Sequence, residues 1–186
     1  IESLGSFGAT FYLEKVEKVG EDKKVKTVPY KTKDEKFENK IGAIINIGSD
    51  ITLIGWSGIF VSHNNNTSYG VLVNMNGKIN AVNDTLGGTG IGIYVNGNIK
   101  HQNNSPIINL NNKANIKSTG TGIYSAGFAT YNIDGATIEG VESGLGIKSG
   151  IFNIINGTIR GTGEDKIPSN GNNNGINHSG ASIQIE

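Results

Sequence analysis

The sequence lacks several features that would place it in a familiar class of protein. It contains no cysteine, which excludes disulfide bonds and thiolate metal sites. Its 16 basic and 16 acidic side chains cancel, so no overall charge draws it toward nucleic acid or an anionic membrane. No run approaches the roughly 18 apolar residues of a membrane-spanning helix. We therefore expect no nucleic-acid partner and no direct insertion of this segment into a membrane.

Apolar residues are also scarce, at 35% of 186 residues, whereas glycine is abundant with 28 copies. Most of the apolar residues are isoleucine and valine, whose stiff side chains favour strands. No segment sustains a 3.6-residue period, so helices should be rare. A β-solenoid fits this composition, because its thin core needs only a few apolar positions per coil.

The first residue is Ile1 and the single methionine is Met75, and no signal peptide is recognisable. We interpret the chain as a segment or processed product of a longer protein.

Residues 1–41 differ from the rest. Within residues 14–40 lie nine of the fifteen lysines and seven of the sixteen acidic residues, with little glycine. Two alternating apolar and polar runs flank Gly20, Glu21 and Asp22, a pattern that predicts a β-hairpin. We interpret 1–41 as an N-terminal strand and charged hairpin that caps or decorates a solenoid, or that contacts a partner.

From residue 42 to residue 186 the sequence repeats itself. Asn132, Ile133, Thr137, Ile138 and Gly140 align with residues 21 positions later, namely Asn153, Ile154, Thr158, Ile159 and Gly161. A fixed period of this size indicates a repeat architecture.

Short strands separated by turns group in threes along this region, including Lys78–Val82, Asn98–Lys100 and Ile107–Leu110. We therefore predict an all-β, right-handed single-stranded parallel β-helix with three strands per coil and about six or seven coils. A recurring Gly-Ile motif would align Gly92, Gly122, Gly146 and Gly175. Excess length would then fall in loops such as His101–Pro106 and Glu164–Asn174, because paired strands cannot absorb insertions.

The same register predicts ladders of side chains. Asn109, Asn132 and Asn153 should form an asparagine hydrogen-bond ladder, and Lys117, Glu139 and Arg160 should stack on one outward face. Leu110, Ile133 and Ile154 should share one inner wall, and Ile116, Ile138 and Ile159 the next. The pairs Asn76-Gly77, Asn96-Gly97 and Asn156-Gly157 should form corners, where glycine permits positive φ.

Chemistry-bearing residues are dispersed. Carboxylates do not cluster as general acid–base catalysis on polysaccharides requires. His63, His101 and His178 have no partner at metal-ligand spacing and stand beside asparagine, so we expect them to be surface residues. The sequence thus predicts no catalytic site, no metal site and no cofactor.

The strings GIGIYVNGNIKH, STGTGIYSAGFATYNIDGATIEG and ESGLGIKSGIFNIINGTIRGTGE carry a resemblance to a known family. They resemble passenger repeats of bacterial surface adhesins, most closely the Ile/Asn/Lys-rich autotransporter passengers of fusobacteria. The resemblance covers about residues 42–186. It implies secretion and display at the bacterial outer membrane, but it assigns no ligand-binding residue.

The leading hypothesis is therefore a non-enzymatic adhesin segment that binds a host cell-surface protein, a glycan or another bacterium. Candidate contacts on the hairpin are Lys23, Lys24, Lys26 and Tyr30, and those on an insertion loop are His101, Asn103 and Asn104. Trp56, with Tyr69, is a weaker candidate, because a lone tryptophan among strands more often belongs to a core or cap. The alternatives are a structural spacer within a long surface stalk and a polysaccharide-active enzyme.

Overall fold

A computed structural model describes residues 15–19, 24–28, 41–63, 70–102, 104–163 and 180–186. These residues contain strands and turns but no helix, as the sequence predicts. The strands are β1 (Lys15–Val19), β2 (Lys24–Val28), β3 (Ile41–Ile47), β4 (Thr52–Gly55), β5 (Ser57–His63), β6 (Gly70–Met75), β7 (Lys78–Ala81), β8 (Ile91–Gly97), β9 (Ile107–Leu110), β10 (Asn115–Ser118), β11 (Thr121–Ser125), β12 (Thr130–Gly140), β13 (Ser143–Ile147), β14 (Ile151–Gly161) and β15 (Ala181–Ile185).

The N-terminal strands confirm the predicted hairpin. β1 and β2 pair antiparallel, with Val19 opposite Lys24 and Lys15 opposite Val28. Alternating runs of this kind form hairpins because every second side chain shares one face.

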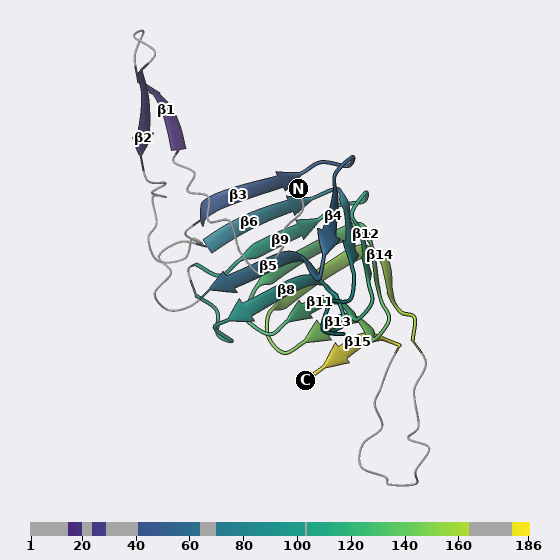
Figure 1. Ribbon diagram of the computed structural model, residues 1–186. Helices are drawn as coiled ribbons and strands as arrows, with labels where there is room; N and C mark the ends of the chain where they lie inside the picture. Colours follow the sequence, from purple (N-terminus) through teal and green to yellow (C-terminus); the bar gives the residue numbers. More distant parts are fainter. Residues whose placement is uncertain (1–14, 20–23, 29–40, 64–69, 103, 164–179) are drawn as a thin grey trace, which may run out of the picture.

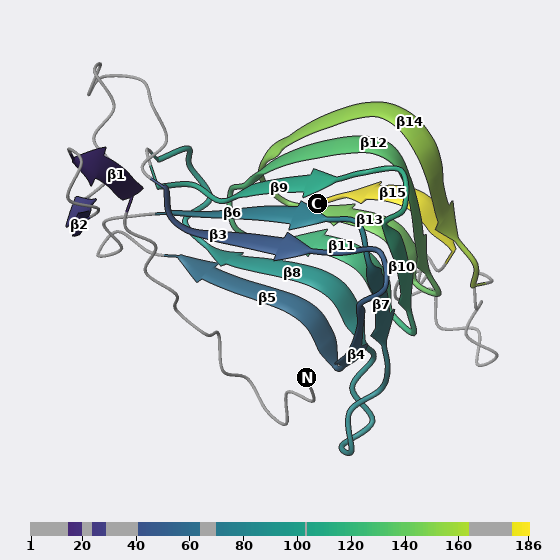
Figure 2. The ribbon, with the colours of Figure 1, turned by 90° about the horizontal axis from the view of Figure 1, so that it is seen from above.

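All other strand pairs are parallel, and strands distant in sequence lie side by side (Figure 1). One sheet has the order β3-β6-β9-β12-β10-β7-β4, with β14 also paired to β12. A second sheet has the order β15-β13-β11-β8-β5. Figure 2 shows the first sheet curling, because the 11-residue strands β12 and β14 bend from one wall to the next. The described chain is thus all-β with a curled parallel sheet, consistent with a parallel β-helix-like fold.

The 21-residue register is confirmed where β12 pairs with β14. Asn132, Ile133, Thr137 and Ile138 stand opposite Asn153, Ile154, Thr158 and Ile159. A β-bulge interrupts the pairing around Asp134. Bulges add one unpaired residue and increase the local bend, so the bulge lies where β12 and β14 turn the corner.

Two details of the predicted register are wrong. Tyr124, rather than Gly122, stands opposite Gly146, because Ile123 pairs with Leu145. Glycines flank Leu145 on both sides, at Gly144 and Gly146. The Gly-Ile motif can therefore be aligned on either glycine, and the two alignments differ by two residues. In addition, Asn98–Lys100 is a turn and not a strand. Gly175 lies outside the described residues.

An asparagine ladder runs across the first sheet and is longer than the sequence predicts. The side-chain amide of Asn153 donates to Asn132, Asn132 to Asn109, Asn109 to Asn74 and Asn74 to Asn46, at 2.7–2.8 Å. Each amide donates toward the N-terminal side and accepts from the other, so the hydrogen bonds run in one direction. We call these five residues the asparagine ladder.

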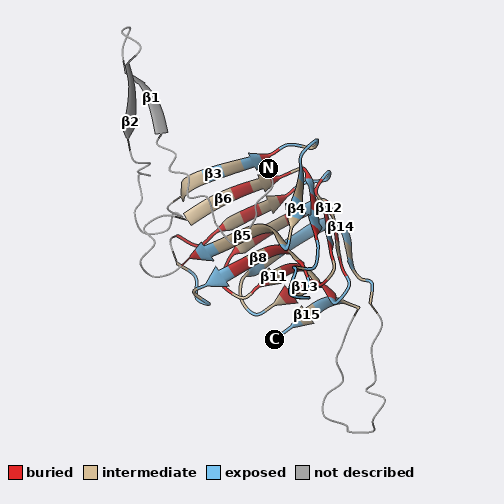
Figure 3. Cartoon of the chain, in the orientation of Figure 1, coloured by how far each residue is buried: buried red, intermediate tan, exposed pale blue. Residues whose placement is uncertain are grey.

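The core is a column of stacked apolar side chains. Ile79, Ile116 and Ile138 follow one another in register and are fully buried, as are Met75, Leu110 and Ile133 on the adjoining wall. Burying such a side chain contributes roughly 1.5–3 kcal/mol. The last row differs from the expectation, because Ile154 on β14 is 44% exposed. Figure 3 shows exposed residues along β14.

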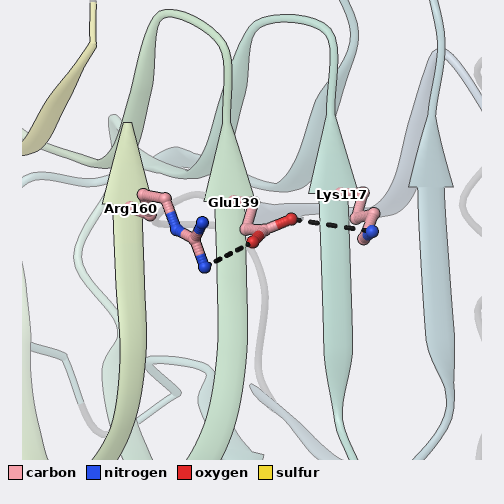
Figure 4. A network of polar contacts seen from close by, with 3 residues as sticks. All are labelled: Lys117, Glu139 and Arg160. Atoms are coloured by element: carbon pink, nitrogen blue, oxygen red, sulfur yellow. Dashed lines mark ion pairs between the residues drawn. The ribbon is translucent and has the colours of Figure 1, made fainter. Parts of the chain in front are cut away.

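The predicted charge ladder is confirmed (Figure 4). Glu139 lies 3.1 Å from Arg160 and 3.7 Å from Lys117, and both cationic side chains are largely exposed. Exposed ion pairs contribute only about 0–1 kcal/mol each, so the core and not this ladder supplies most of the stability.

The predicted corners are of two kinds. Gly97 and Gly157 have φ values of 132° and 131°, in the region that favours glycine. Gly77 does not have a positive φ. There, a Cβ would stand 2.6 Å from the carbonyl oxygen of Ile51, so close packing requires glycine instead.

Candidate functional site

The outer face of the second sheet carries a line of aromatic side chains. Phe60 on β5 stands opposite Tyr94 on β8, and Tyr94 stands opposite Tyr124 on β11. Their neighbours Ile93 and Ile123 are buried in the core. Since successive strand residues alternate between faces, the aromatic rings stand on the outside.

The rings contact one another in series. Phe60 and Tyr94 have centroids 5.2 Å apart, and Tyr94 and Tyr124 stack at 5.7 Å with an interplanar angle of 23°. Trp56, 39% exposed, meets Tyr94 edge-on at 6.5 Å. We call Trp56, Phe60, Tyr94 and Tyr124 the aromatic row. Its rings are held in place by one another and are only half-buried, so part of each remains open to solvent.

The row ends above a glycine. Tyr124 lies across Gly146, where a Cβ would come within 2.9 Å of the ring. Its hydroxyl group donates a hydrogen bond to Glu186 at 3.0 Å. Burial, and then the hydrogen bond to Glu186, raise the pKa of Tyr124. The tyrosine hydroxyl therefore stays protonated at neutral pH and fixes the ring across β13.

Polar groups border the aromatic row on both sides. On one side, Ser57 donates to the carbonyl oxygen of Ile91 at 3.1 Å, and the hydroxyl groups of Thr121 and Ser143 lie 3.2 Å apart. On the other side, the exposed residues Ser62 and Asn96 stand two positions after Phe60 and Tyr94, and the exposed Glu186 accepts the hydrogen bond from Tyr124. The face thus combines aromatic surface with hydroxyl, amide and carboxylate groups.

The hairpin candidates are only partly within the described chain. Lys24 and Lys26 lie on β2, but their side chains are outside the described residues. Lys23, Tyr30 and Tyr69 lie outside the described residues altogether. The positions of these side chains relative to one another therefore lie outside the described residues.

The candidates of the insertion loop have different surroundings. His101 is exposed and packs edge-on against Phe128 at 5.2 Å. Asn104 is buried, so little of its side chain is open to a ligand. Asn103 lies outside the described residues.

His63 corrects the expectation that the histidines are surface residues. It ends β5 and is buried, and neither ring nitrogen has a hydrogen-bond partner among the described residues. Burial lowers the pKa of His63, and a contact with the backbone of Phe128, outside normal hydrogen-bond geometry, opposes this effect only in part. His178 lies outside the described residues.

The lowered pKa predicts a pH effect on stability. The unfolded state, in which histidine has a pKa of 6.5, takes up a proton that folded His63 resists. As the pH falls below 6.5, wild type should therefore lose stability relative to His63→Gln. Urea unfolding of both proteins from pH 7.5 to pH 5 measures this difference, and parallel profiles would contradict it.

The described residues hold neither a metal-ligand cluster nor a membrane-spanning helix. Among them, no three histidine or carboxylate side chains are close enough to hold a metal ion. Asp134 accepts a hydrogen bond from Asn156, while Glu139 lies between two cationic side chains. No helix in this part of the chain is long and apolar enough to cross a membrane.

Comparison of the chain with protein-family models, curated proteins and solved structures finds no match.

Of the aromatic row, the sequence predicts only Trp56 as a candidate contact. A signal for the other three is present, because Gly58-Ile59-Phe60, Gly92-Ile93-Tyr94 and Gly122-Ile123-Tyr124 share one pattern. The predicted alignment rests on the glycines of this motif. The aromatic character of its third position, repeated on three neighbouring strands, also indicates a continuous outer row.

Proposed function

We propose that this chain is a non-enzymatic adhesin segment that binds a glycan on the aromatic row. The row supports this proposal because it places four aromatic rings, partly open to solvent, on one face. The strands that carry the rings are fixed by the core beneath them, so the surface is formed before a ligand arrives. A preformed surface reduces the ordering cost of binding.

A glycan fits the chemistry of this face better than a purely apolar partner. Aromatic rings carry negative charge on their faces, which attracts the weakly positive C–H groups of a sugar ring. The hydroxyl group of Thr121, together with the side chains of Asn96 and Glu186, can exchange hydrogen bonds with sugar hydroxyl groups. Such polar groups beside aromatic surface give a ligand site its specificity.

The setting proposed for this activity is the bacterial cell surface, as the resemblance implies. The segment would be secreted and displayed at the outer membrane, and its partner would be a host cell or another bacterium that carries the glycan. Residues 1–41 would decorate or cap the solenoid of residues 42–186. The finer architecture is a right-handed coil of three strands. In this arrangement the described strands β3–β15 would make up five coils, and loops such as 82–90 take up part of the chain length from which six or seven coils are predicted.

A structural spacer is the second candidate function. The asparagine ladder and the continuous core support it, because both run along the stack of strands and would stiffen a stalk. A polysaccharide-active enzyme has no comparable support, since Glu139 is held between cations and no described carboxylate cluster accompanies it.

The test is a glycan array probed with the labelled full chain and with Tyr94→Ala/Tyr124→Ala. Wild type should bind at least one class of glycan, and the double variant should bind it about five- to 150-fold more weakly. Two aromatic contacts contribute roughly 1–3 kcal/mol together. The control, Asn80→Ala, alters an exposed side chain on the other sheet and should bind like wild type.

A second arm separates the aromatic row from the hairpin. If Lys24→Ala/Lys26→Ala abolishes glycan binding and the tyrosine variant does not, the aromatic row is not the site. If wild type binds neither glycans nor cells, the spacer is the better account.

A further inference from the structure

The C-terminal side of the stack presents an apolar surface, which we call the C-terminal face. It consists of the outer edges of β14 and β15 with the side chains Phe152, Ile154, Ile159, Ile183 and Ile185. Ile154 and Ile183 are 44% and 47% exposed, whereas Ile133 and Leu145, one row earlier, are fully buried. These residues occupy core positions, but no described strand covers them.

The opposite side of the stack presents the matching edge, which we call the N-terminal face. It consists of β3, β4 and β5, each of which pairs on one side only among the described strands. Its core-row residues Ile45, Leu53 and Ile59 are only partly buried. A free strand edge readily pairs with another strand.

The two ends of the asparagine ladder are complementary. Asn153 donates to Asn132, but its own side-chain oxygen accepts no hydrogen bond from the described residues. Asn46 accepts from Asn74, but its amide nitrogen donates none to the part of the chain that the structure describes. One face therefore offers an acceptor and the other a donor, at equivalent positions in the register.

The bend of the strands also matches. On β12, Ile133 and Ile138 are five positions apart, and they pair with Leu110 and Ile116, which are six apart. On β14, Ile154 and Ile159 are likewise five positions apart. At the N-terminal face, Ile47 and Leu53 are six positions apart, as Leu110 and Ile116 are. The chain already contains, between β12 and β9–β10, the type of pairing that β14 would make with β3–β4.

From these observations we propose that the C-terminal face binds the N-terminal face of a second copy of this chain. β14 pairs with β3 and β4 of the next copy, and β15 pairs with β5. Asn46 of the next copy donates to Asn153, while Phe152 meets Ile45 and Ile183 meets Ile59. Because the two faces differ, the contact is head-to-tail and open-ended. The proposal does not rest on the glycan site, although β5 contributes Phe60 to the aromatic row as well.

Sedimentation velocity over a wide range of protein concentration tests the proposal. Wild type should form species that grow beyond the dimer as concentration rises. Ile154→Lys should associate at least tenfold more weakly, because it places a charge in the proposed interface. Ile155→Lys is the matched control, since Ile155 lies next along the same strand, is 69% exposed and does not belong to the paired core row.

The head-to-tail geometry makes a further prediction. Ile154→Lys retains an intact N-terminal face, so adding it to wild type should shorten the assemblies. Growth that stops at a dimer would overturn the proposal, as would a monomer at every concentration or equal effects of the two lysine substitutions.

A crosslink covers the case in which Ile154→Lys fails to fold. The chain has no native cysteine, so Asn46→Cys/Asn153→Cys in one chain introduces a single pair. Mild oxidation should give a ladder of covalent oligomers, whereas each single variant should give at most a dimer. Absence of the ladder from the folded double variant would overturn the proposal.

Discussion

Replacing Tyr131 with alanine should lower the free energy of unfolding by about 3–5 kcal/mol, the range for truncating a large buried aromatic side chain. Tyr131 is fully buried on β12 and stacks on Phe152 with centroids 4.3 Å apart. Its hydroxyl group donates to Ser125 at 3.0 Å. Alanine would remove the packing and the hydrogen bond together, leaving a cavity in a narrow core. Urea unfolding followed by circular dichroism measures the loss.

Tyr131→Phe provides the matched control. It keeps the ring but removes the donor to Ser125, so it should cost about 0.5–1.5 kcal/mol. Burial raises the pKa of Tyr131 far above neutrality, so the hydroxyl group remains a donor throughout this experiment. Equal losses in the two variants would show that the hydrogen bond, and not the packing of the ring, supplies the stability.

Gly97→Ala should be the most disruptive small substitution at a corner. A Cβ at Gly97 would overlap the carbonyl oxygen of His63, and its φ of 132° strains any other residue. The strained backbone alone costs roughly 1–3 kcal/mol, and the overlap must also force β5 and β8 apart. We expect a loss clearly larger than the backbone cost, measured as a fall in the urea midpoint.

Gly87→Ala separates the two contributions. Gly87 also has a positive φ, 86°, but an added Cβ there meets nothing within 4 Å. It should therefore show the backbone cost alone. If the two alanine variants lose the same stability, the close approach of His63 to Gly97 is not a constraint on the fold.

Much of the architecture could be predicted from the sequence because parallel stacking puts equivalent residues side by side. The repeats that align Asn132 with Asn153 also fix Ile133 against Ile154 and Glu139 against Arg160. The asparagine ladder follows from the same register. Its continuation to Asn74 and Asn46 was missed, because loops of different length separate those strands from the clear repeats.

Other features could not be predicted, for identifiable reasons. Gly144 and Gly146 give two equally good alignments, and only backbone pairing decides between them. His63 is buried although its neighbours in sequence are polar, and the backbone of Phe128 that contacts it is far away in sequence. Of the aromatic row, only Trp56 was a candidate contact. Phe60, Tyr94 and Tyr124 each follow a core isoleucine, and they form one line only because β5, β8 and β11 pair side by side.

The central claim is that the aromatic row binds a glycan, and Trp56 tests it most directly. Trp56 is the only tryptophan in the chain and lies at the edge of the row, against Tyr94. Its emission can therefore be titrated with the free form of whichever glycan the array identifies. The account predicts a saturable change in Trp56 emission that is lost in Tyr94→Ala/Tyr124→Ala. Binding of that glycan with unchanged emission, or an unchanged affinity in the double variant, would contradict it.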